Sequence, residues 1–291
     1  MTDGHAVRHA FLGIALAGLL CRAAWADEPV EAVTDVQIVP VDSIRYGVDT
    51  AQAERIGNIL IARGARKGSV IFFLSHRAYE SFTKHPFYDG LGFDGGSLKI
   101  GLGLRYGILD SLDVGILRLN GTVEVFDTYE FDARFRVLRQ ERHGIDVAVR
   151  AGVSWFAQEG HEDASGYLAQ LLADRIFADR CLVGAGLLFH SSSSNDRKSN
   201  HDPKPSLAGT AFAEYRFLRA LAVDLEGAMA MAGYHSKYPT VSAGFKAYTN
   251  RHTFSLLVTN TQYTGADGVV SNTWRSRPSE WILGFNLTRE F

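Results

Sequence analysis

The stretch YEFDARFRV at residues 129–137 alternates between apolar and charged side chains, and IDVAVRAGVSW at residues 145–155 continues the pattern after a short break. Successive side chains of a β-strand point to opposite faces, so each stretch has one apolar face and one polar face. Both stretches are about 9–11 residues long, the length that a tilted strand needs to cross a bilayer, whereas strands of soluble proteins average about 5–6 residues. The two stretches therefore favour strands that cross a membrane.

The same alternation recurs along the chain and predicts a complete set of strands. They are expected at 69–79, 97–107, 112–119, 125–138, 145–156, 167–177, 181–190, 207–217, 221–231, 240–249, 252–262 and 281–291. Short connections alternate with longer ones that are rich in Gly, Ser, Asn and Asp, and only 120–124 breaks this order. An open sheet edge would leave amides unpaired in hydrocarbon, so the sheet must close. We therefore expect an all-β fold, a closed antiparallel transmembrane β-barrel of about 12 strands with short periplasmic turns and longer external loops.

The N-terminal part of the chain differs from the rest. An apolar run at residues 11–20 is followed by Ala24-Trp25-Ala26, which has the small residues that a signal peptidase recognises. We expect a signal peptide over 1–26, an N-terminal periplasmic extension over 27–66 and an outer-membrane β-barrel over 67–291. Within the extension, residues 51–65 could form a short amphipathic helix that packs at the barrel or partly inside it.

Location and partners follow from these segments. An exported barrel belongs in the outer membrane of a Gram-negative bacterium, where its apolar face contacts membrane lipid. The chain stops at Phe291, on an outward position of the last strand, and a terminal aromatic is typical of barrels recognised by the barrel-assembly machinery. The formal net charge of −2 lacks the basic excess of a nucleic-acid-binding surface, so nucleic acid is excluded as a partner.

The polar face of the strands predicts a lumen lined by charges of both signs. The expected lumen or pore-lining residues are Arg77, Lys99, Arg105, Glu130, Asp132, Arg134, Arg136, Asp146, Arg150, His190, Glu214, Arg216, Asp224, Glu226 and Lys246. One interpretation is a structural barrel closed by lumenal ion pairs. The other is a small channel for small polar solutes, with weak ion selectivity because the two signs nearly balance. The sixth strand leaves its register open, since either Arg175 or Gln170 and Asp174 would face lipid.

An enzymatic alternative rests on His190 and Ser192. Outer-membrane phospholipases and lipid A deacylases resemble one another in pairing a His with a Ser two positions later, which places both on one face of a strand. Here, however, Leu187 and Phe189 take the lipid side, and His190 falls on the lumen side. The histidines of the predicted turns form no tight pair, and no glycine-rich phosphate cradle is present. We therefore expect no catalytic residues, no metal and no cofactor.

Several fragments in a fixed order resemble one known family. They are GSVIFFLSHR (68–77), LGLRYGILDSLDVGI (102–116), FRVLRQ (135–140), AEYRF (213–217), VSAGFKA (241–247), FSLLVTN (254–260) and LGFNLTREF (283–291). Together they resemble the DUF5777 β-barrel proteins over roughly residues 55–291. The resemblance implies a β-barrel in an outer membrane and supplies no catalytic residues.

Overall fold

A computed structural model describes residues 54–78, 81, 99–121, 126–157, 162–193, 204–272 and 280–291. The signal peptide expected over 1–26 and the first part of the extension, up to residue 53, lie outside these residues. None of the helices in the described ranges is long and apolar enough to cross a membrane.

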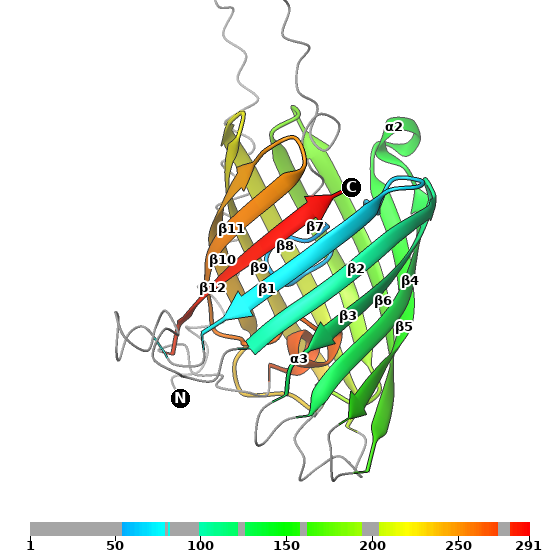
Figure 1. The fold of residues 1–291 in the computed structure, drawn as a ribbon, viewed down its shortest axis with the longest axis vertical. Helices are drawn as coiled ribbons and strands as arrows, with labels where there is room; N and C mark the ends of the chain where they lie inside the picture. Colours follow the sequence, from blue (N-terminus) through cyan, green and yellow to red (C-terminus); the bar gives the residue numbers. More distant parts are fainter. Residues whose placement is uncertain are drawn as a thin grey trace, which may run out of the picture.

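Twelve antiparallel strands form one closed barrel, in which each strand pairs with its neighbours in the sequence and β1 pairs with β12 (Figure 1). The strands are β1 (Val70–Arg77), β2 (Lys99–Leu109), β3 (Leu112–Leu119), β4 (Asp127–Leu138), β5 (Asp146–Ala157), β6 (Ala164–Phe177), β7 (Cys181–His190), β8 (Ser206–Leu218), β9 (Leu221–Gly233), β10 (Thr240–Tyr248), β11 (His252–Thr259) and β12 (Ile282–Glu290). Two short helices, α2 (Gln140–His143) and α3 (Ala266–Ser271), complete the described elements. The predicted fold class is confirmed.

The two ends of the barrel differ in their connections. The short-turn end carries the β2–β3, β4–β5, β6–β7, β8–β9 and β10–β11 connections, and the long-loop end carries the other connections. In Figure 1, α2 marks the short-turn end, and α3 lies toward the opposite end. The predicted sorting by length holds for most connections, but the β4–β5 connection, which contains α2, is longer than the β5–β6 and β9–β10 connections.

Apolar side chains cover the outer wall, as the alternation requires. Leu104, Phe131 and Leu256 are exposed on it, whereas the residues that alternate with them are buried. The open register of β6 is also resolved, because Gln170 and Asp174 are buried inside the barrel. Arg175 points outward near the short-turn end, where its guanidinium lies 4.9 Å from the centre of the Phe177 ring.

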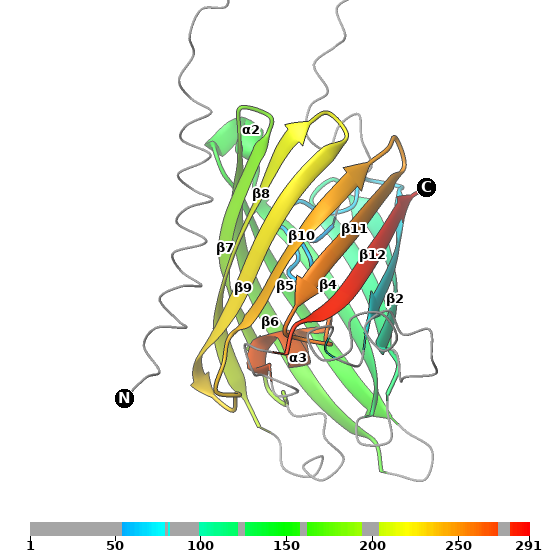
Figure 2. The same cartoon turned by 90° about the vertical axis from the view of Figure 1, so that its left-hand side faces the viewer.

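The segment at residues 54–66, which we call the plug, enters the interior of the barrel (Figures 1 and 2). The helix expected over 51–65 is wrong for the described residues, because 54–65 follow an irregular path in which Arg55 and Leu60 form an isolated bridge. The physical reason is that the barrel wall binds main-chain groups of the plug, which a helix would use for its own hydrogen bonds. Helical periodicity in the sequence carries no information about such distant acceptors.

A second segment, residues 260–272, also folds into the barrel interior, at the long-loop end, and we call it the α3 segment. All of its residues are buried. Val269 and Val270 of α3 belong to the same apolar cluster as Ile56 and Ile59 of the plug. Plug and α3 segment therefore pack on each other in the middle of the barrel.

Candidate functional site: the occupied lumen

The residues that the sequence placed on the lumen face point into the barrel. Arg77, Lys99, Arg105, Glu130, Asp132, Arg134, Asp146, Arg150, His190, Glu214, Arg216, Asp224, Glu226 and Lys246 are all buried, with at most 8% of their surface exposed. Arg136, at the short-turn end, is only partly buried and pairs with Asp146. These residues face the interior, but two further segments of the chain also lie there, so their position alone does not make them pore-lining.

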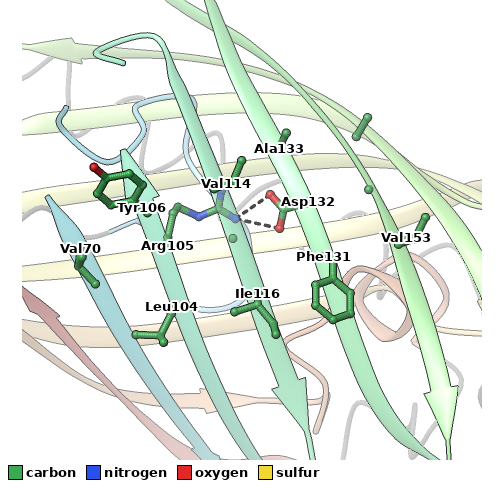
Figure 3. A pocket seen from close by; sticks show the side chains of 13 residues that line it. Val70, Leu104, Arg105, Tyr106, Val114, Ile116, Phe131, Asp132, Ala133 and Val153 are labelled. Atoms are coloured by element: carbon green, nitrogen blue, oxygen red, sulfur yellow. Dashed lines mark hydrogen bonds and ion pairs between the residues drawn. The ribbon is translucent and has the colours of Figure 1, made fainter. Parts of the chain in front are cut away.

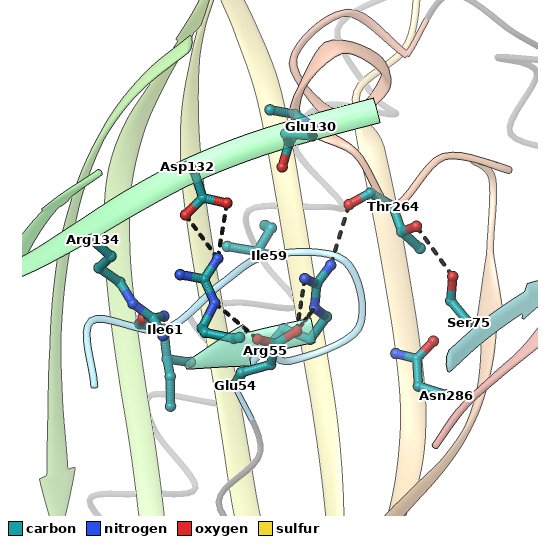
Figure 4. A network of polar contacts seen from close by, with 12 residues as sticks. Glu54, Arg55, Ile59, Ile61, Ser75, Glu130, Asp132, Arg134, Thr264 and Asn286 are labelled. Carbon is teal, nitrogen blue, oxygen red and sulfur yellow. Dashed lines mark hydrogen bonds and ion pairs between the residues drawn. The ribbon is translucent and has the colours of Figure 1, made fainter. Parts of the chain in front are cut away.

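Three arginines from β2, β4 and β5 form a connected network with four carboxylates. Figure 4 shows the part of it around Glu54 and Asp132. The Arg105 guanidinium donates to both oxygens of Asp132, at 2.8 and 2.9 Å, and also pairs with Asp113. Arg150 bridges Asp132, at 2.9 Å, and Glu130. A buried carboxylate or guanidinium is costly unless it is paired, so these contacts are what makes a charged interior tolerable.

The fourth carboxylate, Glu54, comes from the plug and ties it to this network. Its Oε2 lies 3.1 Å from Nε of Arg105, and its Oε1 lies 2.9 Å from Nη2 of Arg55. Burial raises the pKa of the Glu54 carboxyl, but the Arg55, Arg105 and Arg134 guanidinium groups outweigh that effect and hold its pKa below the usual value. Glu54 is therefore an anion that the basic wall holds.

A second polar cluster lies on β8, β9 and β10. Lys246 Nζ donates to Glu214 at 2.7 Å and lies 3.7 Å from an oxygen of Asp224. The Tyr248 hydroxyl donates to the other oxygen of Glu214, and the Arg216 guanidinium stacks 4.1 Å above the Tyr248 ring. Together with the arginine network, this cluster gives the interior nearly balanced charge.

Glu226 is the main anchor of the plug. Its carboxylate accepts hydrogen bonds from the main-chain N–H groups of Gly57, Asn58 and Ile59, at 3.0, 2.7 and 2.9 Å. A Cβ on Gly57 would lie 2.8 Å from Glu226 Oε1, so this close approach depends on glycine. The Asn58 side chain adds two contacts, donating to Glu226 and accepting from Nη2 of Arg77, both at 2.8 Å.

An apolar patch on the inner face of β6, β7 and β8 receives the plug side chains, and the alternation did not predict it. Its members are Leu168, Leu182, Leu188 and Phe212, which form one cluster with Ile56, Ile59 and Ile61 of the plug. The sequence assigned apolar residues to lipid and polar residues to the lumen. In β7, however, Leu188 and Leu182 are buried on the same side as His190.

The plug, the α3 segment and the wall enclose a small cavity. The cavity bounded by Arg55, Ile59, Glu130, Arg150 and Val269 has a volume of about 20 Å³. That is close to the space of one water molecule. Some interior charges also lack hydrogen-bond partners: Nζ of Lys99 and both carboxylate oxygens of Asp224 and of Asp267 have none among the described residues. Among the described residues, the plug and the α3 segment occupy the lumen, and some of its polar groups lack hydrogen-bond partners.

Sequence reasoning missed several interior residues that bind the plug or belong to it. Asp113 on β3 and Asp174 on β6 both accept main-chain N–H groups of the plug. Asp113 alternates with the apolar residues Leu112 and Val114, and this pattern could have predicted that it faces the lumen. Asp174 could not be assigned, because the sequence left two registers open for β6. No local pattern marks Glu54, since its partner Arg105 is distant in the sequence.

The geometry around His190 argues against the lipid hydrolase alternative. Its Nδ1 accepts the N–H of Ser192 at 3.1 Å, so the other nitrogen, Nε2, carries the proton of the neutral ring and donates to Ser154 Oγ at 2.9 Å. A general base for a serine needs the opposite arrangement, with an unprotonated nitrogen facing the hydroxyl. His190 is also fully buried on the inner side, away from lipid. No group of three or more His, Cys, Asp or Glu residues in the described ranges could hold a metal ion.

A large hollow lies on the outer wall, not in the lumen (Figure 3). It has a volume of about 750 Å³, and the side chains that line it include Leu104, Tyr106, Ile116, Phe131 and Val153. Figure 3 shows Arg105 and Asp132 from the same strands turned toward each other on the inner side. The hollow is an uneven part of the apolar outer surface, where small residues such as Ala133 stand between larger ones.

Comparison with known proteins gives one family and several distant structures. A family described as a membrane-bound β-barrel domain (DUF5777) matches residues 52–291. The structure is similar to the COG4313 outer membrane channel from Pseudomonas putida F1, at 12% identity over 79% of this chain and 98% of that chain, with a TM-score of 0.42. It is also similar to the CymD monoaromatic hydrocarbon channel, at 8% identity over 78% of this chain and 89% of that chain, with a TM-score of 0.39. For the outer membrane channel DcaP of Acinetobacter baumannii, the identity is 10% over 77% of this chain and 72% of that chain, with a TM-score of 0.33. No protein of curated function matches the sequence.

Proposed function

Because the chain belongs to the DUF5777 family of membrane-bound β-barrel domains, we propose that it is a non-enzymatic channel for small polar solutes, closed by its own plug. We place it in the outer membrane of a Gram-negative bacterium, with the short-turn end toward the periplasm. We also propose the barrel-assembly machinery as its partner during insertion. The signal peptide over 1–26 stays a prediction.

The observation that carries the proposal is how the plug is held. Its contacts with Glu226, Arg77 and Arg105 are hydrogen bonds and ion pairs, all to groups that water can solvate equally well. The plug also packs on the apolar patch of β6, β7 and β8. Away from this patch, the polar wall loses little when the plug leaves and water enters. A barrel closed permanently gains more from well-packed apolar side chains than from buried ion pairs.

The unsatisfied interior charges support the same conclusion. Among the described residues, Lys99 Nζ and the carboxylate oxygens of Asp224 make no hydrogen bond, although Asp224 forms an ion pair with Lys246. Each such buried group is costly in an apolar or crowded site, and hydration removes that cost. The closed state is therefore only moderately more stable than a hydrated, open lumen. Because acidic and basic walls nearly balance, the open channel has weak ion selectivity.

A second candidate is a structural barrel closed by lumenal ion pairs. The arginine network favours it, since Arg105, Arg134 and Arg150 are all buried and paired with carboxylates on neighbouring strands. The two candidates differ in one respect. A structural barrel gains nothing from a removable plug, whereas a channel must release it.

Liposome swelling tests the channel. We expect wild-type proteoliposomes to swell slowly in arabinose or glycine, and those with Glu226→Gln to swell several times faster. The amide keeps the size of the side chain but loses the charge-assisted hydrogen bonds to three N–H groups of the plug. Glu162→Gln, at an exposed carboxyl of the long-loop end, is the matched control and should swell like wild type. Swelling of the Glu226→Gln liposomes no faster than that of protein-free liposomes would favour the structural barrel.

A further inference from the structure

We propose that the solutes of this lumen are short peptides, whose main chain binds the wall in the way that the plug does now. The inference rests on the proposed channel function and names its substrate class. The plug is itself a peptide segment in an irregular conformation, and the wall holds most of it through groups that every peptide has. In this proposal, the plug is a segment of the same chain that occupies the site where a peptide solute would bind.

Main-chain N–H groups of the plug meet acidic side chains of the wall at three places. Glu226 accepts from Gly57, Asn58 and Ile59, and Asp174 accepts from Ala62. Further toward the short-turn end, Asp113 accepts from Ala65 at 3.2 Å. These three carboxylates belong to β9, β6 and β3, so acceptors are distributed around the barrel.

Main-chain carbonyls of the plug meet donors of the wall in the same stretch. Lys246 Nζ donates to the carbonyl of Arg55 at 3.1 Å, and Asn286 Nδ2 donates to the carbonyl of Gly57 at 2.7 Å. Arg134 Nη1 donates to the carbonyl of Ile61 at 2.7 Å. The wall thus offers both donors and acceptors along the path, so it can bind the C=O and N–H groups that every peptide carries.

The side-chain contacts restrict which peptides fit. Ile56, Ile59 and Ile61 pack on the apolar patch of β6, β7 and β8, so small or aliphatic side chains suit this wall. The free termini of a short peptide would also find partners, since Arg134 and Arg77 can hold a carboxylate and Glu226 can hold an ammonium group. A sugar has no amide groups and no aliphatic side chains, and it matches this wall less well.

The test needs a plug that leaves while the wall stays intact. In Gly57→Pro/Ile59→Pro, the plug-release variant, two of the three N–H donors to Glu226 are lost because proline has no amide hydrogen. Proline at position 57 also brings a Cβ within 2.8 Å of Glu226 Oε1. Heat-modifiable migration in gels, a property of folded barrels, verifies that the full chain has folded.

Single-channel currents of the plug-release variant are recorded while tetraalanine, its fully N-methylated analogue or maltotriose is added. We expect tetraalanine to block the current at a concentration roughly tenfold lower than the N-methylated analogue, which lacks the N–H donors. Adding Glu226→Gln to the plug-release variant should raise the half-blocking concentration of tetraalanine roughly tenfold, and adding Glu162→Gln should not change it. Equal block by all three compounds would overturn the peptide proposal and leave the channel standing.

A binding measurement separates the two proposals if no current is seen. Fluorescently labelled tetraalanine is titrated into the folded plug-release variant in detergent, and anisotropy is measured. Binding that Glu226→Gln weakens would retain peptide recognition and reject only the open channel. Absence of both current and binding would reject both proposals.

Discussion

At the scale of single residues, the neighbours of two buried carboxyl groups of the lumen shift their pKa values in opposite directions. Glu54 lies among arginines that keep its pKa low. Asp267 of the α3 segment is fully buried. Burial, followed by the nearby Glu130 carboxylate, raises the pKa of Asp267 to about 7, and the main-chain N–H of Gly268 and the Lys99 ammonium group offset this only in part. Asp267 is therefore protonated in the docked α3 segment below neutral pH.

This protonation predicts that the α3 segment loosens as pH rises. A solvent-exposed aspartate has a pKa of about 3.9, so the docked segment binds a proton more tightly than a released one between about pH 4 and 7. The equilibrium constant for docking is largest below pH 4 and falls by up to about tenfold per pH unit between about pH 4 and 7. Above about pH 7 it stays constant. Hydrogen–deuterium exchange of residues 260–272 at pH 5 and pH 7.5, corrected for intrinsic rates, measures the change.

Asp267→Asn is the control for this prediction, because the amide is similar in size and does not titrate. Its exchange, after the same correction, should be equal at the two pH values. An exchange rate in the wild-type chain that is as slow at pH 7.5 as at pH 5 would show that Asp267 does not control docking.

The polar residues of the interior could be predicted only where alternation was unambiguous. Arg134 and Arg150 follow from the strict pattern of their strands, and the structure buries both. The inward position of Asp174 was not predictable. It places the charged side chain of Arg175 on the outer wall, and no local pattern in the sequence favours that. Glu54 and Asn58 did not follow either, because their positions depend on contacts made after the barrel has closed.

At the scale of elements, the strands were predictable because one physical rule determines them. Each strand must present an apolar face outward along its whole length, and the segments expected at 112–119 and 181–190 coincide with β3 and β7. The helix expected over 51–65 failed because the plug has no lipid-facing side. Its conformation is determined instead by acceptors on β9, β6 and β3. The boundary between extension and barrel at residue 67 stays a prediction.

The register of β6 leads to a prediction about charges on the outer wall. Leu171 lies outward near the middle of β6, so Leu171→Arg should destabilise the barrel by about 2–4 kcal/mol, the cost of arginine near the bilayer midplane. Leu218→Arg, at the short-turn end of β8, should cost only about 0–1 kcal/mol, as expected near the interface. Folding titrations in urea with lipid vesicles measure both free energies of unfolding.

Equal free energies of unfolding for the two variants would contradict this assignment. They would mean that the outer face of β6 contacts protein or water in place of lipid. A lower free energy of unfolding for Leu171→Arg, with little change for Leu218→Arg, places the hydrocarbon region at the level of residue 171.

At the scale of the whole molecule, a closed wall and a removable interior have separate origins. The wall is a continuous ring in which β1 and β12 complete the hydrogen bonding, so it needs no plug to satisfy its strands. The interior is filled by one segment from the N-terminal side of β1 and another from between β11 and β12. The two segments enter from opposite ends, so the proposed release of the plug does not require the wall to open. The sequence predicted the ring, and it gave no sign that two distant segments would share the space inside.

Single-channel recording in planar bilayers tests most directly whether this barrel is a channel held shut by its plug. The full wild-type chain and Gly57→Pro/Ile59→Pro are inserted under identical conditions, after each has been verified as folded. We predict rare, brief openings for the wild-type chain and stable, discrete conductance steps for the variant. A folded variant that stays as silent as the wild-type chain would contradict the account, because the plug would then not be what holds the lumen shut.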